Sequence, residues 1–310
     1  MTGMETEFLG LRMKNPTVLA SGIQGVTKGT LEEACRKGAA AVITKSLTLE
    51  ARKGHETPIM VQTDSGFLNA VGYSNPGIDE GLEEFSGWKR KEHLIISITA
   101  KSVEEYGILA DKIAEKLKNG ELKCGAIEAV LSCPHTPEFG LMAGQQTPEI
   151  AGRIAKLLKS KLSTPLIMKI SPGVPGEVEV ARAIETAGAD AIDVGNTIGP
   201  GMKIDIERKA RVLGFGMGGL SGPAMKPIAI RCVYDIYKAV KIPIIGCGGI
   251  TYGEDAIEYM MAGASAVAIG TATYYRGTNA FSKIAKEMER WLGEHNYSSV
   301  KEIVGAAHKS

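Results

Sequence analysis

The apolar positions of this chain fall in short runs that recur along its whole length. Eight of these runs are rich in β-branched or small apolar residues and end near glycine, proline or charged residues, which is typical of buried β-strands. The predicted strands are residues 17–20, 41–44, 94–98, 126–132, 165–170, 189–194, 242–246 and 265–269. Because both faces of most runs are apolar, we expect them in a parallel sheet that is covered on both sides.

Segments with the 3.6-residue period of an amphipathic helix separate most of these runs. The clearest predicted helices are 28–37, 102–117, 148–162 and 177–187, and 281–292 with 300–304 are expected to close the chain as amphipathic helices. Eight strand units in 310 residues favour an α/β fold of the (β/α)8 TIM-barrel type over an open sheet. No linker or low-complexity stretch divides the chain, so we expect one domain over residues 1–310.

Three segments depart from the alternation of strand and helix. Residues 4–15 alternate polar and apolar positions around Leu9-Gly10-Leu11, which predicts a hairpin at the bottom of the barrel. Residues 45–93 and 198–226 are long, and each follows the C-terminal end of a predicted strand. Long loops at that end of a barrel usually carry function.

Charge and composition exclude several classes of protein. Thirty-six basic and 35 acidic residues give a net charge of +1, which does not favour a nucleic-acid or membrane-surface partner. No apolar run reaches transmembrane length and no signal sequence is evident, so we expect a cytoplasmic protein. The five cysteines form no CxxC pair and the five histidines have no metal-ligand spacing. We therefore expect no disulfide framework and no metal or iron–sulfur site in the chain.

Two glycine-rich strand ends indicate a phosphate site. Gly246-Cys247-Gly248-Gly249-Ile250 ends the seventh predicted strand, and Gly270-Thr271-Ala272 ends the eighth. In barrels the loops after these two strands often hold a phosphate with backbone N–H groups. The ligand would be a phosphorylated substrate or a phosphate-bearing cofactor. Tight packing of the strand ends is the alternative interpretation.

Two lysines end predicted strands. Lys45 ends the second strand and Lys169 the fifth. A lysine among apolar strand residues is rarely buried without a partner, so the pair suggests an anionic ligand at the rim of the barrel. Such a cation could stabilise negative charge on a flavin ring or on a substrate carboxylate. Surface lysines beyond misjudged strand ends are the alternative.

Side-chain amides are the next candidates. Asn69 lies in the long second loop within Leu68-Asn69-Ala70-Val71-Gly72-Tyr73, and Asn196-Thr197 ends the sixth strand. An amide offers one acceptor and two donors, which matches the edge of a cyclic amide such as a pyrimidine. Asn75-Pro76-Gly77 fits a turn equally well.

Cys133 follows the fourth apolar run and precedes Pro134. A thiol has an ordinary pKa near 8.5, and a nearby cation can increase its thiolate fraction. Cys133 is therefore a candidate nucleophile or general acid/base. His135 is two residues away, but Pro134 leaves a pairing between them open.

These motifs occur in one order from end to end. They are Ala20-Ser21-Gly22, Thr44-Lys45-Ser46, Leu68-Asn69-Ala70-Val71-Gly72, Ser132-Cys133-Pro134, Lys169-Ile170-Ser171-Pro172, Asn196-Thr197, Gly218-Gly219-Leu220-Ser221-Gly222-Pro223-Ala224, Gly248-Gly249-Ile250 and Gly270-Thr271. In this order the chain closely resembles the class 1 dihydroorotate dehydrogenases. The resemblance is strongest to the type whose catalytic subunit pairs with an electron-transfer subunit.

The resemblance implies a flavoprotein that oxidises dihydroorotate to orotate in pyrimidine biosynthesis. The residues that it implies for FMN are Ser21, Lys45, Ser46, Lys169, Gly195, Gly222, Gly248, Gly249, Gly270 and Thr271. Those implied for the substrate are Lys45, Asn69, Ala70, Val71, Gly72, Tyr73, Asn196 and Thr197. Cys133 would take the C5 proton while hydride leaves C6 for the flavin N5, under a loop of residues 136–147 that excludes water.

Three positions depart from the family pattern. Val130 and His135 stand where the family usually has asparagine, and Ser97 stands where the third strand usually offers an asparagine to the flavin. The Ser-Cys-Pro-His form followed by Gly144-Gln145 is similar to the flavin domain of dihydropyrimidine dehydrogenases. The alternatives are thus a reductase-like enzyme of uracil-type rings or a diverged flavoenzyme, and a non-redox phosphate-binding barrel.

The expected partners follow from what the chain lacks. Without a cysteine cluster or a separate dinucleotide-binding unit, an NAD-linked route needs a partner subunit. The resemblance implies that this electron-transfer subunit carries FAD and an iron–sulfur centre. We expect a small dihydropyrimidine as substrate, a homo-oligomer, and neither nucleic acid nor membrane as partner.

Overall fold

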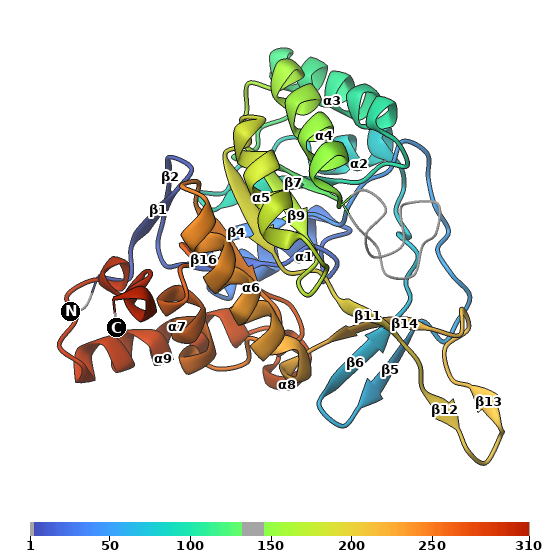
Figure 1. Ribbon diagram of the computed structural model, residues 1–310. Helices are drawn as coiled ribbons and strands as arrows, with labels where there is room; N and C mark the ends of the chain where they lie inside the picture. The colour runs from blue at the N-terminus through green and yellow to red at the C-terminus, as the bar shows by residue number, and fades with distance from the viewer. Residues whose placement is uncertain (1–2, 132–145, 310) are drawn as a thin grey trace.

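A closed barrel of parallel strands forms the centre of the molecule (Figure 1). The computed structural model describes residues 3–131 and 146–309. The barrel strands are β3 (Thr17–Leu19), β4 (Ala41–Ile43), β7 (His93–Ile98), β8 (Ala126–Val130), β9 (Leu166–Ile170), β10 (Ala191–Val194), β15 (Ile244–Cys247) and β16 (Ala266–Ile269). Each lies within or at one of the eight predicted runs, so the predicted TIM barrel is confirmed.

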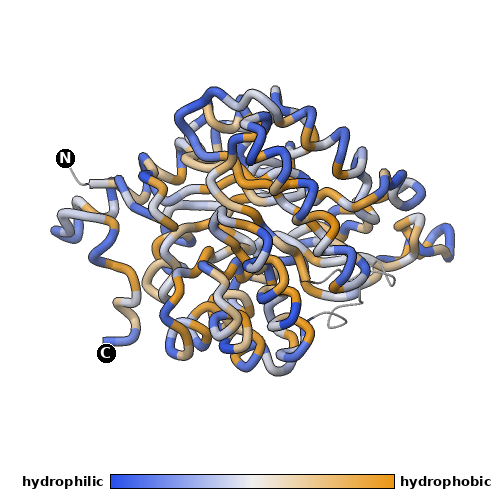
Figure 2. The backbone as a smooth tube through the Cα atoms, turned by 90° about the horizontal axis from the view of Figure 1, so that it is seen from above, coloured by the Kyte–Doolittle hydropathy of each residue, from blue (hydrophilic) through white to orange (hydrophobic). Residues whose placement is uncertain are grey.

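Helices surround the barrel, with α3 to α5 beside one another along one side and α6 and α7 along the next (Figure 1). They are α1 (Lys28–Arg36), α2 (Ile78–Glu84), α3 (Val103–Lys118), α4 (Pro148–Lys161), α5 (Glu177–Thr186), α6 (Lys226–Ala239), α7 (Gly253–Met261), α8 (Ala272–Arg276) and α9 (Ala280–Glu294). Their apolar faces pack on the strands; in α4 the buried residues are Ala151, Ile154, Ala155 and Leu158, at helical spacing. Figure 2 shows the same division, with apolar strands inside and polar segments around the rim.

The N-terminal hairpin closes the bottom of the barrel, as predicted. Strands β1 (Thr6–Phe8) and β2 (Leu11–Met13) pair antiparallel. Phe8 and Met13 are buried in one apolar cluster with residues at the starts of the barrel strands, among them Ala126 and Ala191. The bottom is therefore filled by side chains.

The end of the chain differs from the expectation. Residues Val300–Ile303 form the 3₁₀ turn η3 rather than an amphipathic α-helix, and Ala306–His308 form a second one, η4. Four residues are too few for a helical stripe, and Val300 and Ile303 are buried at the three-residue spacing of a 3₁₀ turn.

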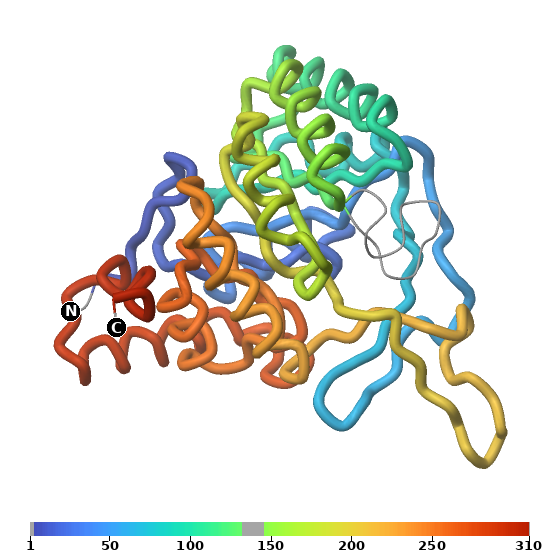
Figure 3. The backbone as a smooth tube through the Cα atoms, in the orientation of Figure 1, coloured from blue at the N-terminus to red at the C-terminus, as the bar shows by residue number. Residues whose placement is uncertain are grey.

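The two long loops fold together into a second sheet. Its strands are β5 (Met60–Thr63), β6 (Gly66–Asn69), β11 (Ile198–Gly201) and β14 (Gly218–Ser221), in the order β11-β14-β6-β5. We call it the extension sheet. A two-stranded hairpin, β12 (Ile204–Asp205) with β13 (Ala210–Arg211), projects beside it, and η2 (Pro223–Met225) leads into α6 (Figure 3). The sequence predicted two long loops here but not their pairing.

Candidate functional site

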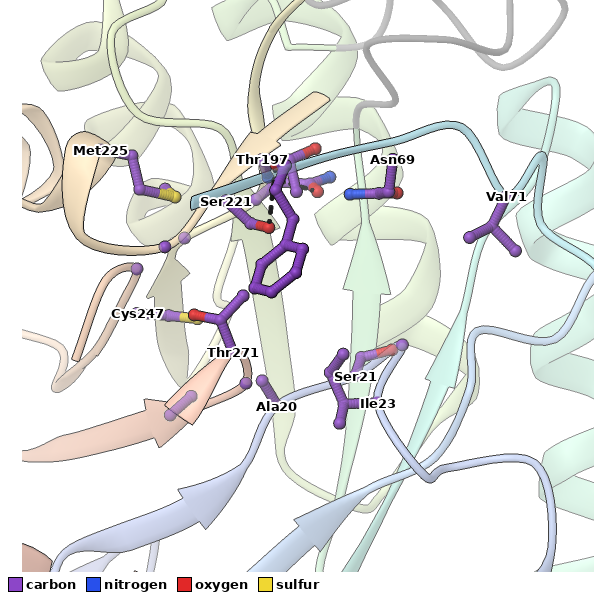
Figure 4. Close-up of a pocket in the computed structure, with 18 of the residues that line it drawn as sticks. Ala20, Ser21, Ile23, Asn69, Val71, Thr197, Ser221, Met225, Cys247 and Thr271 are labelled. Carbon is purple, nitrogen blue, oxygen red and sulfur yellow. Dashed lines mark hydrogen bonds between the residues drawn. The ribbon is translucent and has the colours of Figure 1, made fainter. Parts of the chain in front are cut away.

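A cavity of about 210 Å³ lies between the carboxyl ends of the barrel strands and the extension sheet. In Figure 4 Ala20, Ser21 and Thr271 lie on the barrel side of this cavity, and Asn69 and Ser221 on the side of the extension sheet. We call the barrel side the floor and the extension-sheet side the roof. Ser221 Oγ donates to the Phe67 carbonyl, 3.4 Å away, and so ties the two central strands of the roof together.

The residues that the sequence assigned to a cofactor all line this cavity. They are Ser21, Lys45, Ser46, Lys169, Gly195, Gly222, Gly248, Gly249, Gly270 and Thr271. They come from six different strand ends and from η2, so the closed barrel is what brings them together. Their roles stay predictions.

The predicted phosphate end is built from glycine. Gly248 and Gly249 have φ angles of +123° and +71°, which glycine adopts without strain. A Cβ on Gly249 would lie 2.8 Å from the Gly222 carbonyl oxygen. A Cβ on Gly270 would lie 3.6 Å from Ile23 and 3.8 Å from Ala20, which are ordinary contact distances. Close packing of the strand ends, the alternative interpretation, therefore accounts for glycine at 248 and 249, and the phosphate site stays a prediction.

Lys169 lies on the floor and is paired with two buried acids. Its Nζ lies 2.6 Å from Asp193 Oδ2 and 3.7 Å from Glu128 Oε2. The three residues come from the adjacent strands β8, β9 and β10. Burial lowers the pKa of Lys169, but the charges of Asp193 and Glu128 outweigh burial and raise it. Lys169 is therefore a fixed cation at the floor.

Hydroxyl groups connect this charged cluster with the cavity. Ser97 Oγ donates to Glu128 Oε1 over 2.8 Å and lies 3.0 Å from Ser46 Oγ. Ser21 Oγ lies 3.2 Å from Ser46 Oγ and donates to the Thr44 carbonyl over 2.8 Å. Ser21 and Ser46 line the cavity, whereas Ser97 is fully buried beneath them.

The residues predicted for the substrate divide into two groups. Those that line the cavity are Lys45, Asn69, Val71, Tyr73, Asn196 and Thr197. Ala70 is buried with Leu68 and Leu213 under the extension sheet, and Gly72 packs against His55, so neither is part of the described cavity wall.

Lys45 Nζ lies 5.3 Å from the centre of the Tyr73 ring, a cation–π contact that holds the ammonium group at the rim. Asn69 Nδ2 donates to the Gly219 carbonyl over 3.3 Å. This hydrogen bond uses the amide nitrogen, so the side-chain oxygen of Asn69 remains for a ligand. Thr197 Oγ1 is buried and has no hydrogen-bond partner among the described residues. A polar ligand in the cavity would supply one.

Asn75 has a structural role. Its Oδ1 accepts from Gly77 N over 2.9 Å, and its Nδ2 donates to the Tyr73 carbonyl over 2.7 Å and to Thr48 Oγ1 over 2.8 Å. All the described contacts of its side chain are within the loop, so the turn interpretation holds.

The segment with the predicted base is outside the described residues. Cys133, His135 and most of the predicted covering loop 136–147 lie there. Val130, the last residue of β8, lines the cavity with 3% of its surface exposed. The chain toward Cys133 therefore leaves directly from the cavity wall.

Comparison with known proteins agrees with this geometry. The model of the family described as dihydroorotate dehydrogenase matches residues 3–292. The chain belongs to this family. A dihydroorotate dehydrogenase B (NAD(+)), catalytic subunit, of Pyrococcus abyssi is 43% identical over 306 residues, 99% of both chains. Proteins with the same name from Methanothermobacter thermautotrophicus and Geobacter sp. are 40% and 39% identical over 98% of this chain.

The sequence prediction missed several residues that line this cavity or lie beneath its floor. Glu128 and Asp193 are charged residues inside apolar runs, the same signal that identified Lys169, and could have been found by it. Phe67, Met60 and Tyr274 line the cavity from the roof and from α8. Nothing in their local sequence indicates this, because the cavity exists only once the two long loops pair.

Proposed function

We propose that this chain is the catalytic subunit of a dihydroorotate dehydrogenase, which oxidises dihydroorotate to orotate with FMN as the first electron acceptor. As a member of the family it is an oxidoreductase acting on CH–CH bonds. One observation carries the proposal: the ten positions expected to hold FMN all line one cavity. Thr197 Oγ1, which has no hydrogen-bond partner in residues 3–131 and 146–309, belongs to a residue that lines the same cavity.

The residues present fit the cofactor. Gly248, Gly249, Gly270 and Thr271 would bind the phosphate with backbone N–H groups, and Lys169 would stabilise negative charge on the flavin ring. When bound, FMN accepts a hydride from the substrate. The chain fixes the position of Lys169 through Asp193, so this cation needs no rearrangement when charge develops.

The substrate would lie between the roof and the cofactor. Lys45, at the rim, is suited to the carboxylate of dihydroorotate, and Asn69 and Asn196 to the donors and acceptors of the pyrimidine ring. Cys133 is proposed as the base that removes the C5 proton. Cys133 follows Val130, on the cavity wall, by three positions in the sequence.

Electrons leave through a partner in this proposal. The curated relatives are named as catalytic subunits of an NAD(+) enzyme. Among residues 3–131 and 146–309 no group of histidine, cysteine and acidic side chains could hold a metal ion. We propose a separate electron-transfer subunit that carries the remaining redox groups. No helix of the described chain is long and apolar enough to cross a membrane.

The test is spectroscopic. The purified chain, reconstituted with FMN, is mixed anaerobically with dihydroorotate or with dihydrouracil, and the loss of the flavin absorption band is followed. Dihydroorotate should bleach the flavin and dihydrouracil should not. Bleaching by dihydrouracil alone would favour the reductase-like alternative.

A variant tests the proposed base in the same assay. Cys133→Ala should slow bleaching by about 10²–10⁴-fold while FMN remains bound, because general base catalysis is removed. Cys124→Ala, a cysteine outside the cavity lining, is the matched control and should bleach at the rate of the unchanged chain. Equal rates for both variants would exclude Cys133 as the base.

A further inference from the structure

The charges at the cavity floor do not balance if every group is ionised. Glu128 and Asp193 are fully buried, and the ion pairs described for them both lead to Lys169. One cation between two carboxylates leaves a net charge of −1 inside the barrel. An uncompensated charge in such a place costs several kcal/mol after relaxation, so one carboxyl group is expected to be neutral.

Two oxygen atoms indicate where the proton lies. Glu128 Oε2 and Asp193 Oδ1 are buried and have no hydrogen-bond partner among the described residues. Ionised carboxylates only accept hydrogen bonds, so two of them cannot satisfy each other. A proton on one converts it into a donor for the other.

Electrostatics agrees with this arrangement. The pKa of Glu128 is raised to about 8, mainly by burial; Lys169 acts to lower it, and the charge of Asp193 and a hydrogen bond with it act to raise it. Among the described residues Cys247 of β15 also faces the cluster, and burial raises its pKa to about 12, so it stays a neutral thiol. Lys45 lines the same cavity.

The buried carboxyl group is connected to the cavity. Ser97 Oγ donates to Glu128 Oε1. Ser21 Oγ lies 3.4 Å from Ser97 Oγ and donates to it when its hydroxyl group turns away from the Thr44 carbonyl. Ser46 Oγ, 3.0 Å from Ser97 Oγ, provides a second branch. Both branches begin at residues that line the cavity, and both converge on Ser97.

We propose that Glu128 and Asp193 share one proton, and that Ser97 passes this proton to and from the cavity through Ser46 or Ser21. In the inward step Ser97 gives its hydroxyl proton to Glu128 Oε1 and takes one from Ser46 or Ser21, which is replenished from the cavity. Rotation of the protonated Glu128 carboxyl group about its Cγ–Cδ bond then turns this proton toward Asp193. The floor is then neutral with the proton and carries −1 without it. Binding of an anionic group over Lys169 therefore favours protonation of the Glu128–Asp193 pair. This proposal concerns the chain itself and does not depend on the identity of the substrate.

Infrared spectroscopy of the FMN-loaded protein tests the shared proton. A protonated carboxylic acid has a carbonyl stretch that carboxylates lack. The difference spectrum between the unchanged protein and Glu128→Gln should contain this band, and the band should disappear as the pH rises through about 8. Asp193→Asn should lose it as well, because Lys169 then neutralises an ionised Glu128. Glu207→Gln, an exposed control, should keep it.

Exchange in D₂O tests the route. After rapid dilution into D₂O the carbonyl band of the unchanged protein should shift in a fast phase. The band of Ser46→Ala should also shift fast, because Ser21 remains as a branch. In Ser97→Ala, where both branches are cut, this fast phase should be lost. Absence of the band from the unchanged protein, or its persistence in both acid variants, overturns the shared proton. An equally fast shift in Ser97→Ala overturns the route.

Discussion

The floor and the roof of the cavity are built in opposite ways. The floor consists of neighbouring parallel strands, where Lys169, Asp193 and Glu128 lie on consecutive strands of one barrel. The roof consists of antiparallel strands from two loops, in which Gly219 pairs with Asn69 although 150 residues separate them. The floor is buried and charged, and the barrel fixes its side chains. The roof is half-exposed and has a small hydrophobic core.

This difference suggests a division of labour. Fixed charges in a buried place need no reorganisation, which suits the stabilisation of charge on a cofactor. A sheet whose small core contains Leu68, Ala70 and Leu213 is expected to open more easily than the barrel, which suits the entry and release of substrate. Changes at the floor should therefore affect stability and FMN, and changes at the roof should affect the substrate.

The largest effect is expected at the floor. Lys169→Met leaves Glu128 and Asp193 without their cation and should lower the free energy of unfolding by about 3–5 kcal/mol. Urea unfolding measures this. Lys203→Met, beside the extension sheet, removes one exposed hydrogen bond to the Gln62 carbonyl and should change it by about 0.5 kcal/mol or less. Equal losses in the two variants would contradict the comparison.

At the roof, Asn69→Ala should weaken substrate binding rather than stability. The variant removes an amide from the cavity wall and should raise the KM for dihydroorotate about 10- to 100-fold, the equivalent of about 1–3 kcal/mol. Steady-state kinetics and an FMN titration measure the two effects separately. Weaker FMN binding with an unchanged KM would mean that the roof belongs to the cofactor site.

The pH dependence of stability distinguishes the floor from ordinary carboxylates. Glu128 has a pKa of about 8 in the folded chain against an ordinary value of 4.5, so the folded state binds more protons between these pH values. The stabilising contribution of Glu128 to the free energy of unfolding is complete below about pH 4.5. It is lost as the pH rises toward 8, by at most about 1.4 kcal/mol per pH unit. Denaturation midpoints of Glu128→Gln should lack this decline, and a decline identical to that of the unchanged chain would contradict the assignment.

The smallest effect is expected from Val130→Asn, at the junction of floor and loop. The amide would restore a hydrogen-bonding group to the cavity wall and should tighten orotate binding by about 1 kcal/mol, roughly fivefold. Fluorescence quenching of the flavin by orotate would measure the change. Weaker binding would show that the wall requires an apolar side chain at this position.

The same contrast explains what the sequence could predict. The eight barrel strands and Lys169 were found because apolar runs and an isolated charge are local signals. The sequence predicted Asn69 as a ligand residue, but it did not predict the strand pairing that places Asn69 opposite the floor. Pairing of β6 with β14 is non-local, and alternation in four-residue strands is too short to specify it. Ala70 and Gly72 were assigned by motif position, and the local fold turns both toward other neighbours.

Anaerobic mixing of the FMN-loaded chain with dihydroorotate tests the central claim most directly. The account predicts that the flavin absorption band is bleached, that one orotate forms for each flavin reduced, and that no partner subunit is required for this half-reaction. A chain that binds FMN but keeps its oxidised spectrum with dihydroorotate would contradict the proposed substrate. A chain that cannot be reconstituted with FMN would contradict the assignment of the cavity itself.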